Sequence, residues 1–156
     1  MQKINTTALD KKLKLIENYI SYAEQINPKV SKANVGWHLD HSLKVINSVV
    51  KAMQGSDSKL YKDNFSFLGK ALLQFNYFPR GKAKAPKHVK PPEIVLQNDI
   101  IIQLSNAREN IKEVQNLDKN AHFKHPLFGN VNKARVVRFL NTHTNHHLKI
   151  VKSILK

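Results

Sequence analysis

The chain contains no cysteine, which excludes disulfide bonds, thiolate metal ligands, a cysteine nucleophile and thiol redox chemistry. Any metal site must therefore be built from histidine and carboxylate side chains. The sequence also has no run of 18 apolar residues, and the Met1 end is polar, with no apolar signal segment. We therefore expect neither a membrane-spanning segment nor a signal peptide. These absences predict a soluble, cytoplasmic protein with no membrane partner.

Acidic residues are scarce, because 11 Asp and Glu face 26 Lys and Arg, which gives a net charge of +15. An excess of this size predicts an anionic partner, and charge alone does not choose among a nucleic acid, a membrane surface and a small anion. The basic residues are spread along the chain, and no helix-turn-helix or zinc-finger spacing is visible. We expect no specific nucleic-acid partner, and non-specific, salt-sensitive nucleic-acid binding remains an alternative function.

The length of 156 residues and the hydrophobic content of 41% fit a single domain over residues 1–156. Four segments repeat apolar residues at alternating spacings of four and three, which predicts four helices of about 20 residues each. These segments are residues 9–23, 39–53, 100–114 and 137–154. Thr7 and Asp10 are placed as a capping box for the first helix, and Pro91-Pro92-Glu93 suits the start of the third. The pattern predicts an all-α four-helix bundle.

The connection between the second and third helices, about residues 55–91, is long. Its apolar residues between Tyr61 and Phe75 recur with a helical period, which predicts an extra short helix inside this crossover. The prolines and basic residues that follow predict an irregular chain. Residues 121–132 are expected to form a second irregular connection, and no strand pattern is visible. Four aromatic residues are expected in the core or in a pocket wall: Trp37, Phe75, Tyr77 and Phe78.

Five of the eight histidines fall on two predicted helices. At about 100° per residue, His147 lies at the centre of the apolar arc of the last helix, with His143 still inside the arc and His146 at its edge. Histidines one turn apart on one helix face can both reach one metal ion. Burying two histidines on an apolar face costs free energy unless a metal ion or hydrogen bonds satisfy their ring nitrogens. Hydrogen-bonded core histidines are the alternative interpretation.

A third ligand must come from another helix. On the second helix, His38 falls inside the apolar arc and His41 lies just outside it, beside Trp37. Periodicity slightly favours His38. A pocket at the end of a bundle also uses positions at the edge of the arc, so the spacing leaves the choice open.

Four segments of the chain resemble the DinB/YfiT-like superfamily, in particular a branch with an HPxFG segment and a C-terminal HTxHH-type helix. The segments are Gly36-Trp37-His38-Leu39-Asp40-His41-Ser42-Leu43, Pro79-Arg80-Gly81-Lys82-Ala83-Lys84-Ala85-Pro86, His125-Pro126-Leu127-Phe128-Gly129 and His143-Thr144-Asn145-His146-His147-Leu148. The resemblance implies a four-helix bundle with a long second connection and a divalent metal ion, nickel or zinc. It implies His41, His143 and His147 as the ligands. His38, His146 and His125 are then alternative ligands or hydrogen-bonding neighbours of the ligands.

Members of the superfamily include thiol-dependent transferases and isomerases. The resemblance therefore implies a metal-dependent transferase or hydrolase that acts on a small anionic substrate or a low-molecular-weight thiol. Arg80, Lys82 and Lys84 in the crossover are candidates for binding the anion, and a solvated basic loop is the alternative. A bundle that binds a metal or a small ligand without catalysis is a further alternative. Leu15, Tyr19 and Tyr22 extend the apolar face of the first helix, and they either form a dimer surface or pack under the crossover. The resemblance favours the homodimer.

Overall fold

The computed structural model describes residues 3–156. Within these residues it contains five α-helices and one pair of antiparallel strands. The helices are α1 (Thr7–Tyr19), α2 (Val35–Gln54), α3 (Phe67–Gln74), α4 (Gln97–Glu113) and α5 (Lys133–Ile154). The strands are β1 (His122–His125) and β2 (Gly129–Asn132).

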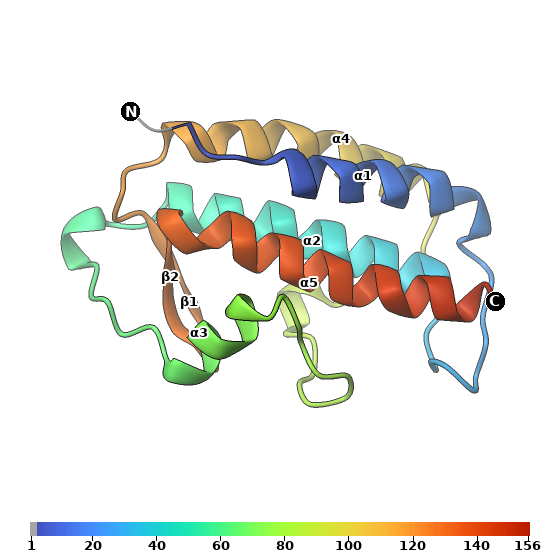
Figure 1. The fold of residues 1–156 in the computed structure, drawn as a ribbon. Coiled ribbons are helices and arrows are strands. Elements are labelled where there is room, and N and C mark those ends of the chain that lie inside the picture. Colours follow the sequence, from blue (N-terminus) through green and yellow to red (C-terminus); the bar gives the residue numbers. More distant parts are fainter. Residues whose placement is uncertain (1–2) are drawn as a thin grey trace.

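The four long helices lie lengthwise beside one another in two layers, with α1 and α4 in one layer and α2 and α5 in the other (Figure 1). Helix α2 contacts both α4 and α5, and α1 contacts the same two helices. Helices α2 and α4 run in the same direction, opposite to α1 and α5 (Figure 1). Because neighbouring α2 and α4 are parallel, the chain must return along the bundle between them. This return explains the long crossover.

The apolar residues that repeat at spacings of four and three, which we call the seams, form the core. Every seam residue of the first three long helices is buried. On α5, Leu140, Val151 and Ile154 are buried, whereas Val137 is only partly buried. Removing an aliphatic side chain of this size from water contributes about 1.5–3 kcal/mol. The seams therefore provide the main driving force that brings the four helices together.

Two helix starts differ from the sequence expectation. Helix α1 begins after Thr6, whose hydroxyl donates to Asp10 Oδ2 at 2.8 Å, so Thr6 and not Thr7 pairs with Asp10. Helix α4 begins at Gln97, beyond Pro91-Pro92-Glu93, and Leu96 at its cap still has an extended backbone. A proline disfavours the helical conformation of the residue before it, so tandem prolines prolong the extended chain. Helices α1 and α4, with 13 and 17 residues, are shorter than expected.

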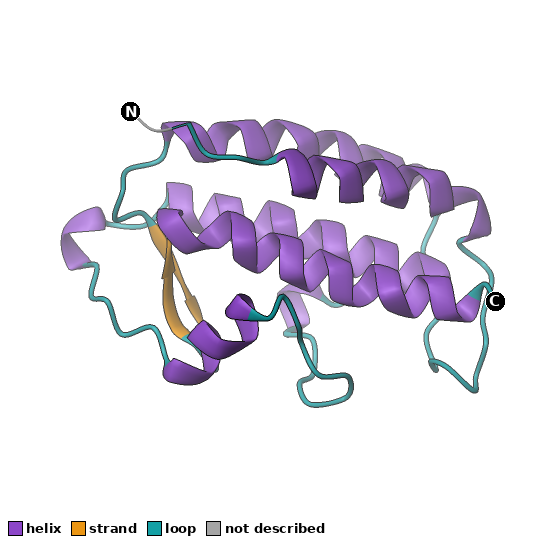
Figure 2. Cartoon of the chain, viewed as in Figure 1, coloured by secondary structure: helices purple, strands orange, loops and turns teal. Residues whose placement is uncertain are grey.

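The expectation that residues 121–132 contain no strand is wrong. This segment forms the β1–β2 hairpin, in which His122 pairs with Asn132 and His125 pairs with Gly129. The hairpin lies at the end of the bundle where α2 ends and α5 begins (Figure 2). Each strand has four residues and only one apolar side chain, Phe123 or Val131. Such short strands have no alternating pattern by which the sequence could reveal them.

The crossover packs on the α2 and α5 layer, on the side away from α1 and α4 (Figure 1). Its predicted helix is shorter than the apolar pattern, because α3 starts only after Ser66, which caps the amide of Gly69 at 3.0 Å. A Cβ at Gly69 would lie 2.7 Å from the Phe65 ring, so glycine allows close packing there. Phe75 and Tyr77 are exposed, and their expected place in the core or a pocket wall is wrong.

The three residues named for a dimer surface differ in exposure. Leu15 and Tyr19 pack against the core of their own chain, and Tyr22 alone of the three is exposed. Among the described residues, no helix combines the length and the apolar character needed to cross a membrane.

Candidate metal centre

Three histidines meet between the antiparallel helices α2 and α5. His41 lies in the first half of α2, and His143 and His147 lie one turn apart on α5. Each offers one ring nitrogen, and these three nitrogens lie within 4.8 Å of one another. No other such group of three potential ligands occurs within residues 3–156. The structure therefore brings together the three residues that the resemblance implied.

The orientation of His41 is fixed by the crossover. Its Nδ1 donates to the carbonyl oxygen of Val89 at 2.9 Å, which leaves Nε2 as the lone-pair nitrogen of the neutral ring. The Trp37 ring stacks on the His41 ring with 5.1 Å between centroids. A backbone carbonyl behind a ligand histidine sets both the tautomer and the direction of the ring.

His147 is held by a second histidine. Its Nδ1 lies 3.0 Å from His38 Nδ1, and His38 Nε2 lies 3.0 Å from the hydroxyl of Ser31. If His147 binds a metal through Nε2, its Nδ1–H donates to His38, whose Nε2–H then donates to Ser31. His38 is thus a hydrogen-bond partner of His147, whereas His41 belongs to the three-histidine group. Of the two positions that periodicity left open, the structure places His41 with the α5 pair and His38 behind it.

His143 has a buried nitrogen without a partner. The ring is half-buried and stacks on Phe139 with 6.1 Å between centroids, but its Nδ1 makes no hydrogen bond within the described residues. An unpaired buried polar group costs about 1–3 kcal/mol. A ligand bound to this nitrogen would offset the penalty. Three histidine nitrogens within 4.8 Å of one another fit the donor set of a metal site.

His146 and His125 lie outside the three-histidine group. His146 Nδ1 donates to the carbonyl oxygen of Phe78 at 2.9 Å, which fastens the crossover to α5. His125 Nδ1 accepts from the amides of Leu127 and Phe128, at 3.1 Å and 3.2 Å, and so shapes the hairpin turn. Both side chains therefore have structural partners.

Burial keeps the three central imidazoles neutral. It is the largest cause that lowers the pKa of His41, and it holds the pKa values of His143 and His147 well below the ordinary value. Neighbouring histidines lower the pKa of His143 and His147 further. Asp40 and the bond to Val89 oppose the effect only at His41. Since a metal binds the neutral ring, protons compete weakly for this site at neutral pH.

No carboxylate belongs to the group. Asp40, next to His41 in sequence, is buried on the side of α2 that faces α4, where it pairs with Lys44 at 2.7 Å and accepts from Gln103. Glu93 is exposed. The donor set is therefore three neutral imidazoles.

Of the three basic candidates in the crossover, Arg80 has the clearest relation to the cluster. Its charge contributes to lowering the pKa of His38 and His146. All three side chains are exposed, so they are open to an anion from solvent.

Sequence reasoning missed several residues that surround the cluster. Phe139 stacks on His143 from four residues earlier on α5, and this spacing on one helix face was an available signal. The carbonyl oxygens of Val89 and Phe78 bond to histidines through the backbone, which leaves no mark in the sequence. Ser31 precedes α2 and reaches His38 only because the intervening chain turns.

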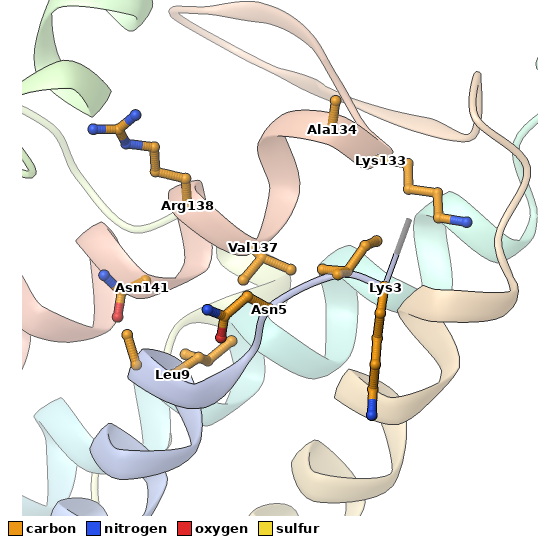
Figure 3. Close-up of a pocket in the computed structure, with 10 residues that line it drawn as sticks. Lys3, Asn5, Leu9, Lys133, Ala134, Val137, Arg138 and Asn141 are labelled. Atoms are coloured by element: carbon orange, nitrogen blue, oxygen red, sulfur yellow. The ribbon is translucent and has the colours of Figure 1, made fainter. Parts of the chain in front are cut away.

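A surface cavity of about 470 Å³ has no histidine among its lining residues (Figure 3). Lys3, Asn5 and Leu9 line it from the start of the chain, and Lys133 and Arg138 line it from α5. Lys133 Nζ donates to the carbonyl oxygens of Gln115 and Leu117, and Arg138 donates to the carbonyl oxygen of Gln74. Because these cations already have partners, the histidine cluster is the stronger candidate for chemistry.

Comparison of the chain with protein-family models, curated proteins and solved structures gives no match. The three-histidine group is therefore the feature of the chain that points to a function.

Proposed function

We propose that the chain is a metal-dependent enzyme of the DinB/YfiT-like kind, with His41, His143 and His147 as metal ligands. The convergence of three imidazole nitrogens within 4.8 Å is the observation that carries the proposal. The parallel pair α2 and α4, joined by a long crossover, supports it because the resemblance implies that connection. Nickel or zinc suits a site of imidazole nitrogens.

A divalent ion held by three neutral imidazoles keeps its full charge and would supply Lewis acidity that lowers the pKa of a coordinated thiol or water. The chain's own residues hold the ligands in place. Val89 orients His41, and His38 orients His147. The rings of Trp37 and Phe139 pack on ligand histidines and keep water from their faces.

The proposed reaction is a transfer or hydrolysis on a small anionic substrate, with a low-molecular-weight thiol as a candidate co-substrate. Arg80 is the proposed anion-binding residue because it is exposed and its charge acts on two histidines beside the cluster. A guanidinium presents a planar fork that matches a carboxylate or a phosphate. Lys82 and Lys84, which lie two and four residues after Arg80, add positive charge to the same loop.

The test is an assay of zinc-loaded and nickel-loaded protein with a panel of low-molecular-weight thiols and anionic electrophiles. We expect turnover that requires the metal and is lost in His147→Ala. We expect Arg80→Ala to raise KM more than it lowers kcat, whereas Arg108→Ala on α4 changes neither. Turnover that persists after chelation, or equal effects of the two arginine variants, would contradict the proposed roles.

A bundle that binds a metal or small ligand without catalysis is the second candidate. The observation that favours it is the lack of a carboxylate in the histidine group, since Asp40 is engaged by Lys44 and Gln103. Stoichiometric metal binding without turnover on any thiol and electrophile pair would select this function.

A further inference from the structure

Large apolar side chains on α3 and just after it face solvent. Phe67 is 86% exposed, Leu68 53%, Phe75 78% and Tyr77 54%. At about 100° per residue, Phe67, Leu68 and Phe75 fall within an arc of about 100°. The buried residues Gly69 and Leu73 fall on the opposite side. Helix α3 therefore packs one apolar face on the core and presents another to solvent, and such exposed faces mark interaction sites.

The same segment is purely basic. Between Asp63 and Glu93 the sequence contains six Lys and Arg and no Asp or Glu. All six are exposed, and none belongs to an ion pair among the described residues. Acidic side chains gather on the far layer, in α1 and α4: Asp10, Glu17, Asp99, Glu109 and Glu113. The side of the molecule with α3 and the crossover loop (Figure 1) is therefore positive.

We propose that this face docks onto an anionic lipid membrane. We name it the α3 surface and define it by Phe67, Leu68, Phe75, Tyr77, Lys82 and Lys84. Proteins that bind at the membrane interface insert apolar side chains at the boundary of the acyl chains, while lysines and arginines meet anionic head groups. The α3 surface offers both on one side of the bundle.

Two other occupants fit these observations less well. A second copy docked through the same surface would bring two unpaired sets of six cations together, and like charges across an interface oppose association. A single-stranded nucleic acid would match the charge, but it binds by stacking bases on aromatic rings. The aliphatic side chain of Leu68 adds nothing to stacking, whereas it adds to insertion in lipid.

This proposal selects one of the three anionic partners that the net charge left open. It departs from the expectation of no membrane partner, which rested on the lack of a spanning segment. A peripheral surface needs no such segment, because a few apolar side chains and several cations suffice for interfacial binding. Binding to lipid requires no metal ion, and it shares only Lys82 and Lys84 with the proposed anion site.

The test is cosedimentation of the full chain with vesicles of phosphatidylcholine alone and of phosphatidylcholine mixed with phosphatidylglycerol. We expect binding to the anionic vesicles only, and weaker binding when the salt is raised from about 0.15 M to about 1 M, where screening shortens from about 8 Å to about 3 Å. Phe67→Ser/Phe75→Ser should reduce binding by on the order of tenfold or more, because two inserted rings are lost. Ile101→Ser/Ile102→Ser removes two large apolar side chains that are about half exposed on α4, and it should leave binding unchanged.

Charge variants test the electrostatic part separately. Lys82→Glu/Lys84→Glu should abolish most of the binding, whereas Lys11→Glu/Lys14→Glu on α1 makes the same change in net charge and should have a small effect. No binding to anionic vesicles, or equal losses in matched variants, would overturn the proposal. If Phe67 and Phe75 are needed for binding to oligodeoxythymidylate and not for binding to vesicles, the partner of this surface is a nucleic acid and the lipid proposal is wrong. If sedimentation velocity shows a wild-type dimer and a monomeric Phe67→Ser/Phe75→Ser variant, the partner of this surface is a second copy of the chain and the lipid proposal is wrong.

Discussion

His38 is predicted to tune metal affinity without binding the metal. Its Nδ1 lies 3.0 Å from Nδ1 of His147, and its side chain is only 4% exposed. The substitution His38→Phe keeps an aromatic ring but removes the hydrogen-bond partner of His147. In the metal-free protein, His147 can then move its proton to the other nitrogen. With metal on Nε2 it cannot, and a buried Nδ1–H is left unpaired.

The magnitude follows from that one lost hydrogen bond. An unpaired buried donor costs about 1–3 kcal/mol, and the penalty falls mainly on the metal-bound state. The loss of a hydrogen-bond partner behind a ligand histidine typically reduces metal affinity by about 10–100-fold. The two values agree, since tenfold corresponds to about 1.4 kcal/mol. We therefore expect His38→Phe to weaken zinc binding by about 10–100-fold while the fold is kept.

Competition of the protein with a chromophoric chelator for zinc measures this change, and circular dichroism checks the fold. His146→Phe is the matched control, because it makes the same replacement on α5, where the histidine bonds to the carbonyl of Phe78 and not to a ligand. Its affinity should stay near that of the wild type. Wild-type affinity in His38→Phe, or the same loss in both variants, would refute the reasoning.

Two further predictions concern stability. Burial lowers the pKa of His125 from 6.5 to about 4, so its neutral ring contributes fully to stability above pH 6.5 and the contribution is lost as pH falls towards 4. The loss should be on the order of 2 kcal/mol for this partly exposed ring, and the difference between wild type and His125→Phe in urea denaturation from pH 7 to 4 separates it from the other buried histidines; parallel profiles would contradict it. Gly129 has φ +80°, and a Cβ there would lie 2.5 Å from the Asn64 carbonyl oxygen, whereas Gly81 at φ +69° has open space around it. Gly129→Ala should lower the free energy of unfolding by about 2–4 kcal/mol, and Gly81→Ala should lower it by about 1 kcal/mol. Equal decreases in the melting temperature of the two variants would show that the close contact at Gly129 does not matter.

The sequence predicts the long helices well because helical periodicity is local. Seams such as Leu39 to Met53 are buried in the structure. The histidine pair on α5 was found for the same reason, since four residues make one turn. The choice between His38 and His41 was not local. It depends on how α2 is rotated against α5, and both residues in fact face that helix, one in the group and one behind it.

The features that the sequence did not reveal depend on contacts between distant segments. The β1–β2 hairpin has one apolar residue in each strand, so its pairing has no periodic signature. Helical spacing predicted an element around α3, but the spacing does not say which side packs on the core. Phe75 was therefore placed inside, although it is exposed. The carbonyl of Val89 orients His41 only because the crossover folds back over α2.

The central claim is that His41, His143 and His147 bind a divalent metal ion. Metal analysis by mass spectrometry on untagged protein, beside His143→Ala/His147→Ala, tests it most directly. We expect about one nickel or zinc ion per chain, which is lost in the double variant. Folded wild-type protein that is free of metal and cannot be reloaded with nickel or zinc would contradict it, and the histidines would then be structural.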